Sequence, residues 1–507
     1  MIERFEWAVT DRTPDALFDR ARSIAPDVTA SVTGIIESVR LGGDEALRAL
    51  ARRFDGVELE MIEVPRAARL SALANLNSDV RSALEKATEA IVAFHSAQLP
   101  QQLEIETHVG VRVGRRTEAL RRVGVYAPGG RAAYASSVLM GVLPARVAGV
   151  AEVAVCSPPD THGAPPQAVL AACEIAGADR VYSIGGAGAI AALALGTASI
   201  ERVAKVVGPG NAYVNEAKRQ LNGVVGIDCP AGPSELLIIS DDSADPRLLA
   251  AEILAQAEHD PDAACVLIAT SVEILEATSR AVEDLANGLT SIQTIRQALA
   301  RNGALLSVDT LDEAIRLAEK YAPEHLMIAT REPRRLLDRI RCAGTVFLGQ
   351  HSSVVFGDYI TGANHVLPTA GLSRTYSGLS TADFLRSYTY QEVDRGGAVR
   401  LAGVAAVLAG AEGLPAHAVA ARQHGVSALG RDVYSGVELY DPARERWGMD
   451  LSDNTNLFGE DPIVREAIAR APSTAVSRYP GVYATDLKCA IAEYHGVAPD
   501  NVVTGCG

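Results

Sequence analysis

Two residues that could bind a metal stand three apart in residues 251–260, where the apolar spacing predicts an amphipathic helix. Residues three apart share one face of a helix, so the amide oxygen of Gln256 and the imidazole of His259 could hold one divalent cation. Glu258 points to another side, where it could fix the imidazole. A Gln and a His at this spacing are more often a polar helix end, so the metal interpretation depends on ligands from other segments.

Later segments contain side chains of a suitable type. Residues 357–369 (GDYITGANHVLPT) follow a predicted strand, and their irregular polar sequence, which includes Asp358, is typical of a site loop. His417 lies beyond an Ala-rich helix predicted over residues 395–411. With Gln256 and His259, these residues form a mixed oxygen and nitrogen set that suits Zn²⁺ and leaves room for a substrate. By itself, His417 would be a solvated helix residue.

Glu324 and His325 are candidates for acid–base chemistry because they are adjacent, at the predicted end of a helix and start of a strand. Adjacent side chains point to different sides, so a carboxylate and an imidazole could flank one substrate as two general bases of different strength. Ser234, which precedes the run ELLIISD, could hydrogen-bond a polar substrate. The simpler interpretations are a charged strand edge for the pair and a turn cap for the serine.

Glycine-rich turns after predicted strands could bind a nucleotide. The run GAGAIA (186–191) has the order G-x-G-x-x-A and opens a helix, but the acidic residue expected about twenty positions later is not clear. GPGN (208–211) also joins a strand to a helix, and YAPGG (126–130) precedes another helix, as in an anion-binding turn. Close helix–strand packing or a plain tight turn explains these glycines equally well.

The elements that position these residues alternate between strand and helix. Between residues 151 and 349, helical spacing separates the short apolar runs AEVAVCSP, RVYSIGG, RVAKVVG, ELLIISD, ACVLIAT, ALLSV, HLMIAT and TVFLG. This alternation predicts βαβ units and a parallel, doubly wound sheet, in which ligands lie at the carboxyl ends of the strands. Residues 13–98 have helical spacing, and VGVRVGRR and RRVGVYAP predict further strands.

Composition and charge narrow the class of protein. The chain has 507 residues, 48% of them hydrophobic and 21% charged, which suits a globular protein of about three domains. A net charge of −15 repels phosphate backbones and argues against nucleic acid as a partner. The start MIERFEWAVTDR lacks the order of a signal peptide, and the apolar run 401–411 is too short to span a membrane. Seven dispersed cysteines without a CxxC pair predict reduced thiols in a cytoplasm.

Several motifs occur together in one order: YAPGG, GPGNAYVNEAKRQL, IDCPAGPSELL, QAEHD, YAPEHL, GDYITGANHVLPT and EGLPAH. Over about residues 5–425 the chain thereby resembles the histidinol dehydrogenase family. The resemblance implies a zinc-dependent oxidation of L-histidinol through L-histidinaldehyde to L-histidine with two NAD⁺, the last step of histidine biosynthesis. It also implies one Zn²⁺ per subunit and an interlocked homodimer, in which the segment with Glu412 and His417 reaches the partner's site.

The resemblance also implies a role for each candidate residue. The implied zinc ligands are Gln256, His259, Asp358 and His417, and the implied substrate contacts are Ser234, Gln256, His259, His325, Asp358, Glu412 and His417. Glu324 and His325 match the proton acceptors, and Tyr126, Gly188 and Asn211 match the positions that contact NAD⁺. The family usually has Gln where this chain has Gly188, so either a backbone group replaces the amide or the nucleotide binds more weakly. The sequence QHSSVVFGDY also departs from the family, which more usually has a Pro-containing turn before GDY.

A mechanism follows from these implied roles. Zinc bound to the amine and imidazole of the substrate would orient it, and His325 would take the alcohol proton while hydride passes to NAD⁺. Glu324 would then activate water to hydrate the aldehyde before the second hydride transfer. A thiohemiacetal on Cys229, the one cysteine inside these motifs, is the competing route.

The sequence changes character after residue 435. We expect a dehydrogenase region over residues 1–435, with a helical N-terminal arm to about residue 105, an α/β core of two doubly wound, Rossmann-like parallel-sheet domains at about 106–385, and a helical segment at about 386–435. Residues 436–447 have linker composition. Residues 448–507, with SRYPGVY and VVTGCG, resemble the truncated start of histidinol-phosphate aminotransferase, a pyridoxal-phosphate enzyme. The cofactor-binding Lys, Asp and Arg of that family lie in parts absent here, so we expect neither pyridoxal phosphate nor transaminase activity. A chance likeness in a disordered tail is the alternative.

Two other functions remain open. The chain could be a related zinc and NAD⁺ dehydrogenase that acts on another small polar alcohol or diol, or a catalytically silent zinc-binding scaffold for the fused aminotransferase. The pair Glu324 and His325 favours an enzyme, because a scaffold needs no paired bases.

Overall fold

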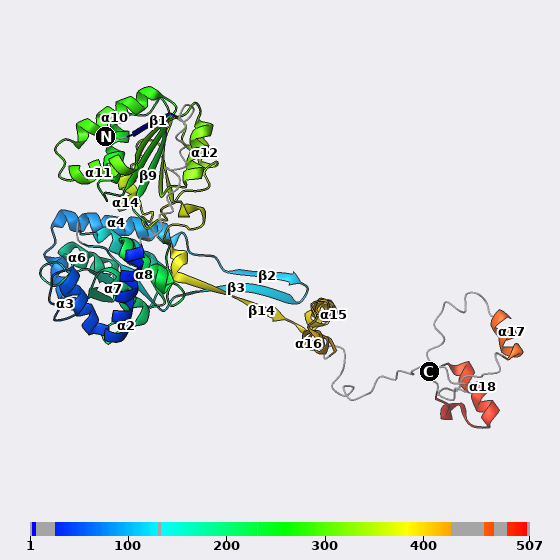
Figure 1. Cartoon of the computed structure of the whole chain (residues 1–507). Helices are drawn as coiled ribbons and strands as arrows, with labels where there is room; N and C mark the ends of the chain where they lie inside the picture. The colour runs from blue at the N-terminus through cyan, green and yellow to red at the C-terminus, as the bar shows by residue number, and fades with distance from the viewer. Residues whose placement is uncertain are drawn as a thin grey trace.

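Two parallel sheets covered by helices form the body of the protein in the computed structural model (Figure 1). The structure describes residues 3–6, 26–129, 133–230, 232–426, 461–470 and 484–503. Alternate side chains along each buried strand enter two different cores, one on each face of the sheet. The expected α/β fold with two doubly wound parallel sheets is therefore confirmed.

The first sheet has the strand order β6-β5-β4-β7-β8. Its strands are β4 (Arg122–Tyr126), β5 (Glu152–Ser157), β6 (Arg180–Ser183), β7 (Lys205–Val207) and β8 (Gly226–Ile227). Ala154 and Cys156 belong to a core with α2 (Pro26–Phe54), α7 (Gly186–Leu195) and α8 (Ala212–Leu221). Val153 and Val155 belong to the other core, with α4 (Ser78–Ser96), α5 (Ala135–Ala148) and α6 (Gln167–Ala176), and α3 (Arg66–Ala74) packs on α6.

The second sheet has the strand order β1-β11-β10-β9-β12-β13. Its strands are β1 (Glu3–Glu6), β9 (Glu235–Ser240), β10 (Ala264–Ala269), β11 (Gly303–Ser307), β12 (His325–Ala329) and β13 (Thr345–Leu348). The helices α9 (Pro246–Ala257), α10 (Val272–Ala286) and α11 (Ile292–Asn302) share one core with it, and α12 (Leu311–Tyr321) lies in the other. The short helices α13 (Arg334–Leu337) and α14 (Val354–Tyr359) flank β13 in sequence.

Both sheets reverse their winding direction beside their central strand. In the first sheet β4 lies between β5 and β7, and in the second β9 lies between β10 and β12. Each sheet therefore has a topological switch point, at β4/β7 in the first sheet and at β9/β12 in the second. There the crossover connections on the two sides lead to opposite faces of the sheet. Such points are where a doubly wound sheet has room for a ligand.

An antiparallel arm projects from the body (Figure 1). It consists of β2 (Leu103–His108), β3 (Val111–Ala119) and β14 (Leu385–Val393), and it carries α15 (Arg395–Ala411) and α16 (Pro415–Val426) at its far end. We expected residues 386–435 to be helical, but the helices begin at Arg395. β14 gave no strand signal because its side chains are almost all exposed or half-buried, so no apolar alternation marks it.

The last described parts are two helices and a short 3₁₀ turn, α17 (Pro462–Arg470), α18 (Thr485–His495) and Pro499–Asn501. The predicted linker at 436–447 lies outside the described residues. Within the part of the chain that the structure describes, no helix is both long enough and apolar enough to cross a bilayer.

Candidate active site

Glu324 lies just before β12 and is held by the start of β9. Its Oε2 accepts hydrogen bonds from Ser234 Oγ at 2.6 Å and from the backbone N–H of Glu235 at 2.7 Å. The side chain is almost fully buried, and burial raises the pKa of the Glu324 carboxyl well above its usual value, while the two hydrogen bonds oppose the rise. A carboxyl with a raised pKa can accept and return a proton near neutral pH.

His325 is the first residue of β12 and presents one ring nitrogen as a proton acceptor. Its Nδ1 lies 3.0 Å from the carbonyl oxygen of Glu235. Because a carbonyl only accepts, the neutral ring carries its proton on Nδ1 and leaves a lone pair on Nε2. Nε2 is buried 3.8 Å from Asp358 Oδ1 and has no hydrogen-bond partner among the described residues. Burial lowers the pKa of His325, which keeps the ring neutral at neutral pH.

The turn that presents these two residues has a strained backbone. Ala322 has φ 49°, a left-handed conformation that a residue with a Cβ rarely adopts. Its carbonyl oxygen accepts a hydrogen bond from Ser373 Oγ at 2.7 Å, which holds the turn. Ala370, which has φ 55°, donates its N–H to Glu235 Oε1 at 3.0 Å. The loop around residues 369–373 therefore fixes the starts of β9 and β12 together.

These groups lie at the amino ends of β9 and β12, whereas doubly wound sheets usually bind ligands at carboxyl ends. The candidate residues of the second sheet therefore lie before their strands rather than after them. The reason lies in the connection between the sheets. Residues 228–234 connect the carboxyl end of β8 to the amino end of β9. The carboxyl ends of the first sheet and the amino ends of the second sheet therefore border the same connection.

Gln256 lies in the last turn of α9 and is 2% exposed, and its Nε2 has no hydrogen-bond partner among the described residues. The helix ends at Ala257, so His259 lies in the turn beyond it, and the expectation that both share one helix face is wrong. Glu258 accepts a hydrogen bond from Ser291 Oγ at 2.9 Å, a contact outside the predicted metal set.

Asp358 lies in α14, which α9 holds in place because Glu252 Oε2 accepts the N–H of Val354 at 2.9 Å. The carbonyl oxygen of Asp358 lies 2.9 Å from His365 Nδ1, and His365 Nε2 lies 3.3 Å from Ser137 Oγ in α5. Burial lowers the pKa of His365, and the charges of Asp358, His325 and His259 act on the same ring. His259, Asp358 and His325 therefore all lie close enough to the His365 ring for their charges to act on it.

The residues on the body fit the zinc proposal in type. An amide oxygen, an imidazole and a carboxylate form a set of hard and borderline ligands that Zn²⁺ accepts. Among the described residues, no three His, Cys, Asp or Glu side chains are grouped closely enough to hold a metal ion. This result is expected for the predicted set, because one member is Gln256 and another, His417, lies on the arm.

Glu412 and His417 lie apart from the other candidates within one chain. Glu412 caps α15, His417 lies in the first turn of α16, and both are exposed. Figure 1 shows these helices at the far end of the arm, away from β9 and β12. A single chain therefore does not bring these two residues to Glu324 and His325.

The candidate NAD⁺ residues gather at the carboxyl edge of the first sheet. Tyr126 ends β4, and its hydroxyl accepts the N–H of Gly186 at 3.1 Å. Burial raises the pKa of Tyr126 to about 12, so the phenol stays neutral. Gly188 lies in the first turn of α7, and Asn211 caps α8 by accepting the N–H groups of Tyr213 and Val214. Both turns thus direct helix N-termini to the β4/β7 switch point, a favourable place for a dinucleotide.

Some groups that position the candidate site residues could not be identified from the sequence. The Glu235 carbonyl that orients His325 is a backbone acceptor, which no residue type announces. Ser137, in contrast, follows the YAPGG motif at a helix start, and its pairing with His365 joins α5 to the site loop.

The chain is similar to known proteins over most of its length. Residues 18–424 match the family model described as Histidinol dehydrogenase. A protein named histidinol dehydrogenase from Methanothermobacter thermautotrophicus is 46% identical over 80% of this chain and 96% of its own length, and one from Natronomonas pharaonis is 49% identical over 81% and 97%. A crystal structure of histidinol dehydrogenase from Elizabethkingia anophelis superposes with a TM-score of 0.82 at 34% identity and covers 85% of this chain and 99% of its own.

Proposed function

The chain belongs to the histidinol dehydrogenase family, and from that premise we propose how its residues divide the work of the reaction. It is an NAD-dependent oxidoreductase that oxidises histidinol to histidine in histidine biosynthesis. We propose two successive oxidations, from L-histidinol to L-histidinaldehyde and then to L-histidine, each with one NAD⁺. A related alcohol or diol as substrate, or a silent scaffold, has less support, because the chain matches proteins named histidinol dehydrogenase over nearly the whole length of those proteins.

His325 is the proposed base of the first oxidation. Its Nε2 carries a buried lone pair, because the ring proton is on Nδ1, which donates a hydrogen bond to the Glu235 carbonyl. The ring takes the hydroxyl proton of histidinol as the carbinol carbon loses a hydride. A bound NAD⁺ would supply the acceptor for that hydride, and a second NAD⁺ would supply the acceptor in the later step.

Glu324 is the proposed base of the second oxidation. Burial raises the pKa of its carboxyl, and Ser234 and the Glu235 N–H hold one of its oxygens in place. The carboxylate accepts a proton from a water as its oxygen adds to the aldehyde carbon, and the resulting hydrate anion gives the acid when its carbon loses a hydride to the second NAD⁺. Ser234 is the proposed additional contact to the substrate.

Gln256, His259, Asp358 and the partner subunit's His417 are the residues we propose to hold Zn²⁺, one ion per site. The bound ion would supply a fixed point for the amine and imidazole of the substrate. On the body of the chain, α9 and α14 are joined through Glu252 and Val354, which supports placing Gln256 and Asp358 beside one ligand. Glu412 from the partner is the remaining proposed substrate contact.

Tyr126, Gly188 and Asn211 are the proposed NAD⁺ contacts. Adding a Cβ at Gly188 would bring it to 2.8 Å from Leu50 Cδ1, so α2 fills part of the space that the family's Gln would enter. We therefore propose that the backbone of α7, rather than a side chain at position 188, contacts the nucleotide.

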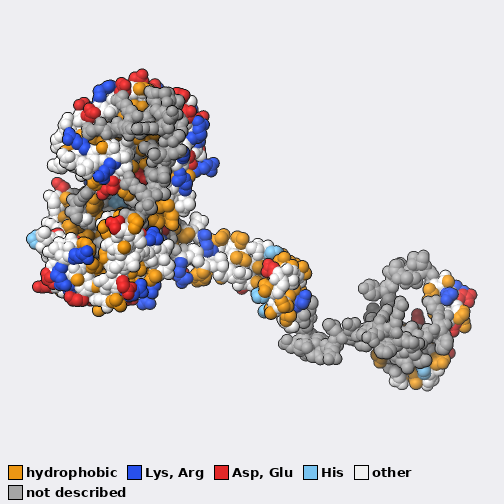
Figure 2. Space-filling model, viewed as in Figure 1, with side chains coloured by type: hydrophobic (Ala, Val, Ile, Leu, Met, Phe, Trp, Pro, Cys, Tyr) orange, Lys and Arg blue, Asp and Glu red, His pale blue; other side chains and the backbone are white. Residues whose placement is uncertain are grey.

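A homodimer with shared sites is proposed from the arm. Apolar side chains gather on the arm and its terminal helices (Figure 2), where Val404, Val407 and Leu408 are each more than 60% exposed. An apolar surface of this kind on a projecting element is typical of an interface. A second copy that covers it would also bring Glu412 and His417 to a body that lacks them.

The remaining proposals concern the tail and the location. We propose that residues 436–447 link the dehydrogenase region (1–435) to an aminotransferase-like start at 448–507, supported by SRYPGVY and VVTGCG, whereas the family match ends at residue 424. A cytoplasmic location is supported by the free cysteines among the described residues.

The observation that carries the proposed mechanism is the buried, unpartnered Nε2 of His325 beside Asp358. The zinc part is tested by comparing wild type with His259→Asn, and with His495→Asn as a matched control, because His495 is exposed on α18 outside the family match. NADH absorbance with histidinol should fall more than about a hundredfold in His259→Asn alone, together with the zinc content per subunit. Equal rates in the three proteins would refute the metal assignment.

A further inference from the structure

A buried ion pair lies between the two halves of the proposed site. Lys218 of α8 and Asp228, which follows β8, expose only 1% and 3% of their side chains, and Lys218 Nζ lies 2.5 Å from Asp228 Oδ1. Neither residue belongs to the proposed catalytic, substrate, metal or NAD⁺ sets. Burying a charge pair carries a large desolvation cost, and apolar residues of similar volume often stabilise a core as well or better. The pair therefore calls for an explanation other than core stability.

Both members of the pair bind the same residue, Gly208. Lys218 Nζ donates to the Gly208 carbonyl oxygen at 2.6 Å, and the Gly208 N–H donates to Asp228 Oδ2 at 2.7 Å. The acceptor and the donor of one residue are thus fixed by opposite charges. These are charge-assisted hydrogen bonds, which are stronger than neutral ones, so the position of Gly208 is well defined.

Gly208 needs this fixing because its conformation is open only to glycine. Its φ is +119°, and an added Cβ would lie 2.1 Å from the carbonyl oxygen of Tyr126. The residue therefore packs directly on the end of β4. Three residues later the same turn reaches Asn211, which caps α8, and Lys218 lies on that helix. Tyr126 thus packs on Gly208, the turn runs from Gly208 to Asn211, and α8 runs from Asn211 to Lys218. The ion pair connects the end of this path back to Gly208.

The pair also reaches the substrate half. Asp228 begins the segment 228–234 that ends at Ser234, whose hydroxyl donates to Glu324. The N–H of Asp228 donates to the Val206 carbonyl at 3.3 Å, which holds the start of this segment on β7. One buried carboxylate therefore connects the nucleotide turn with the chain that leads to the substrate residues.

We propose that Lys218 and Asp228 are positioning residues for NAD⁺, which hold the Gly208–Asn211 turn in the shape that binds the dinucleotide. The inference rests on the proposed NAD⁺ site at Tyr126 and Asn211. Without the pair the turn becomes ordered only when the nucleotide binds, so apparent NAD⁺ affinity falls by the fraction of molecules in the competent shape. The bases that act on histidinol stay in place, because β9 and β12 hold them independently.

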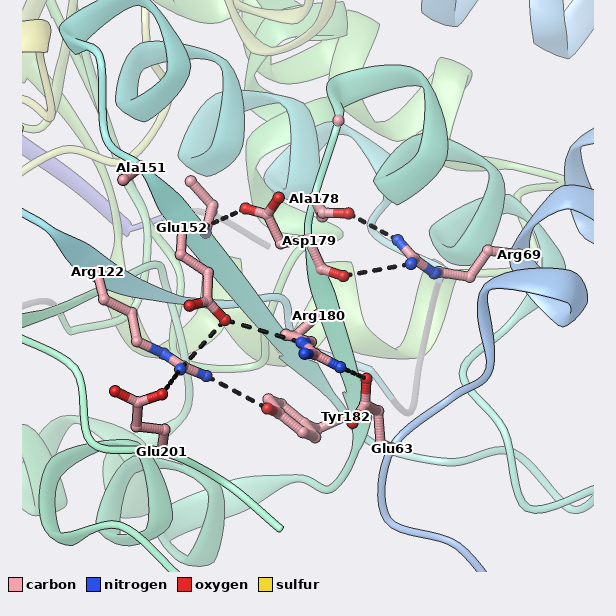
Figure 3. Close-up of polar contacts among 12 residues, drawn as sticks. Glu63, Arg69, Arg122, Ala151, Glu152, Ala178, Asp179, Arg180, Tyr182 and Glu201 are labelled. Atoms are coloured by element: carbon pink, nitrogen blue, oxygen red, sulfur yellow. Dashed lines mark hydrogen bonds and ion pairs between the residues drawn. The ribbon is translucent and has the colours of Figure 1, made fainter.

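The control is another ion pair of the same sheet, in which the arginine is buried and its carboxylate partners are partly or mostly exposed. Arg122 starts β4 at the end opposite Tyr126. Its Nη1 lies 3.1 Å from Glu152 Oε1 and 2.6 Å from Glu201 Oε2. Figure 3 shows the guanidinium between these two carboxylates, with Tyr182 beside it. Arg122→Met removes a buried charge from β4 of the same sheet without touching the Gly208 turn. It reports what loss of stability alone does to the kinetics.

The test measures KM for NAD⁺, KM for histidinol, kcat and the thermal midpoint for Lys218→Met, Asp228→Asn, Arg122→Met and Asn211→Ala. We expect Lys218→Met to raise KM for NAD⁺ about tenfold or more, with KM for histidinol and kcat at saturating NAD⁺ within about threefold of wild type. Asp228→Asn keeps an acceptor oxygen and should raise KM for NAD⁺ by a smaller factor. Arg122→Met should lower the midpoint and leave KM for NAD⁺ unchanged. If Lys218→Met does not fold, Asp228→Asn against Arg122→Met decides the question.

Three outcomes would each overturn one of two claims, the positioning role or the NAD⁺ site. If Asn211→Ala raises KM for NAD⁺ but neither Lys218→Met nor Asp228→Asn does, the positioning role is wrong and the NAD⁺ site stands. The positioning role is also wrong if Lys218→Met changes both KM values and kcat alike, as a general structural defect would. If Asn211→Ala leaves KM for NAD⁺ unchanged, the proposed NAD⁺ site itself is wrong.

Discussion

The thiol of Cys229 lies in the segment between Asp228 and Ser234 and is 5% exposed. Burial raises the pKa of this thiol to about 12, so very little thiolate forms at neutral pH. Because the thiolate is the nucleophile, a thiohemiacetal on Cys229 is disfavoured against the water route through Glu324. We expect Cys229→Ala to keep kcat within about twofold for both histidinol and histidinaldehyde, measured by NADH absorbance.

A selective loss would contradict this expectation. If Cys229→Ala oxidises histidinol but no longer oxidises histidinaldehyde, the second step needs the sulfur and Glu324 is not its base. Glu324→Gln is the companion variant, and it should slow oxidation of the aldehyde more than oxidation of the alcohol.

For single residues, the sequence predicted the types of the candidate side chains more readily than the groups that these side chains contact. The pair Glu324 and His325 was identifiable because two ionisable residues stand where a helix gives way to a strand. Their orientation was not, because it depends on the N–H and carbonyl of Glu235, and every residue carries those groups. The roles that the family resemblance implies for Gln256, His259 and Asp358 remain predictions.

The helix α4 places a histidine in the core. His95 is 0% exposed, and Thr381 Oγ1 lies 3.4 Å from its Nδ1 and donates to its carbonyl oxygen. Burial lowers the pKa of His95 below its usual 6.5, so the folded state keeps the ring neutral while the unfolded chain takes up a proton below that pH. The free energy of unfolding should therefore be unaffected by His95 above pH 6.5 and fall as the pH drops from 6.5 towards the lower folded pKa.

Replacement of this histidine tests the sign. The contribution of one such group has a limiting slope of about 1.4 kcal/mol per pH unit. Urea unfolding at about pH 7.5 and about pH 5.5 should show a smaller loss of stability in His95→Asn than in wild type. The variant has lower stability at both values because it loses packing, so the difference between the two pH values is the measurement. An equal difference in both proteins would show that His95 does not titrate in this range.

The elements themselves were predictable where burial gives them a pattern. The eight apolar runs from residue 151 to residue 349 all form parallel strands, because strands covered on both faces are continuously apolar. The end of α9 was placed too late, although Pro261 disfavours helical backbone at the residue before it. The exposed strand β14 carries no burial pattern, so its pairing with β3 could be found only from the fold.

The molecule as a whole has a body that carries the two proposed bases and an arm that carries the candidates Glu412 and His417. The body is built from buried strands and could be inferred from one chain. The arm could not, because exposed Val404, Val407 and Leu408 on α15 make sense only against a surface that the same chain does not supply. The proposed interlocked pair of chains accounts for both the apolar arm and the separation of Glu412 and His417 from the body.

Mixing two inactive variants tests this sharing of sites. Glu324→Gln damages the body and His417→Ala damages the arm, so neither homodimer should form histidine from histidinol, and histidine formation is the activity measured. In a heterodimer with shared sites, one site receives both defects and the other receives none. Random mixing by co-refolding makes half of the dimers mixed, so about one quarter of all sites should be intact and kcat per site should recover to about that fraction.

The control mixes two arm variants, His417→Ala with Glu412→Gln. Each site of that heterodimer receives one damaged arm, so no activity should return whichever way the chains combine. Recovery with the body and arm variants, and none with the two arm variants, requires that the arm serve the neighbouring chain. If each chain instead completed its own site, neither mixture would regain activity, and Glu412 and His417 would have to reach β12 by folding back along their own arm.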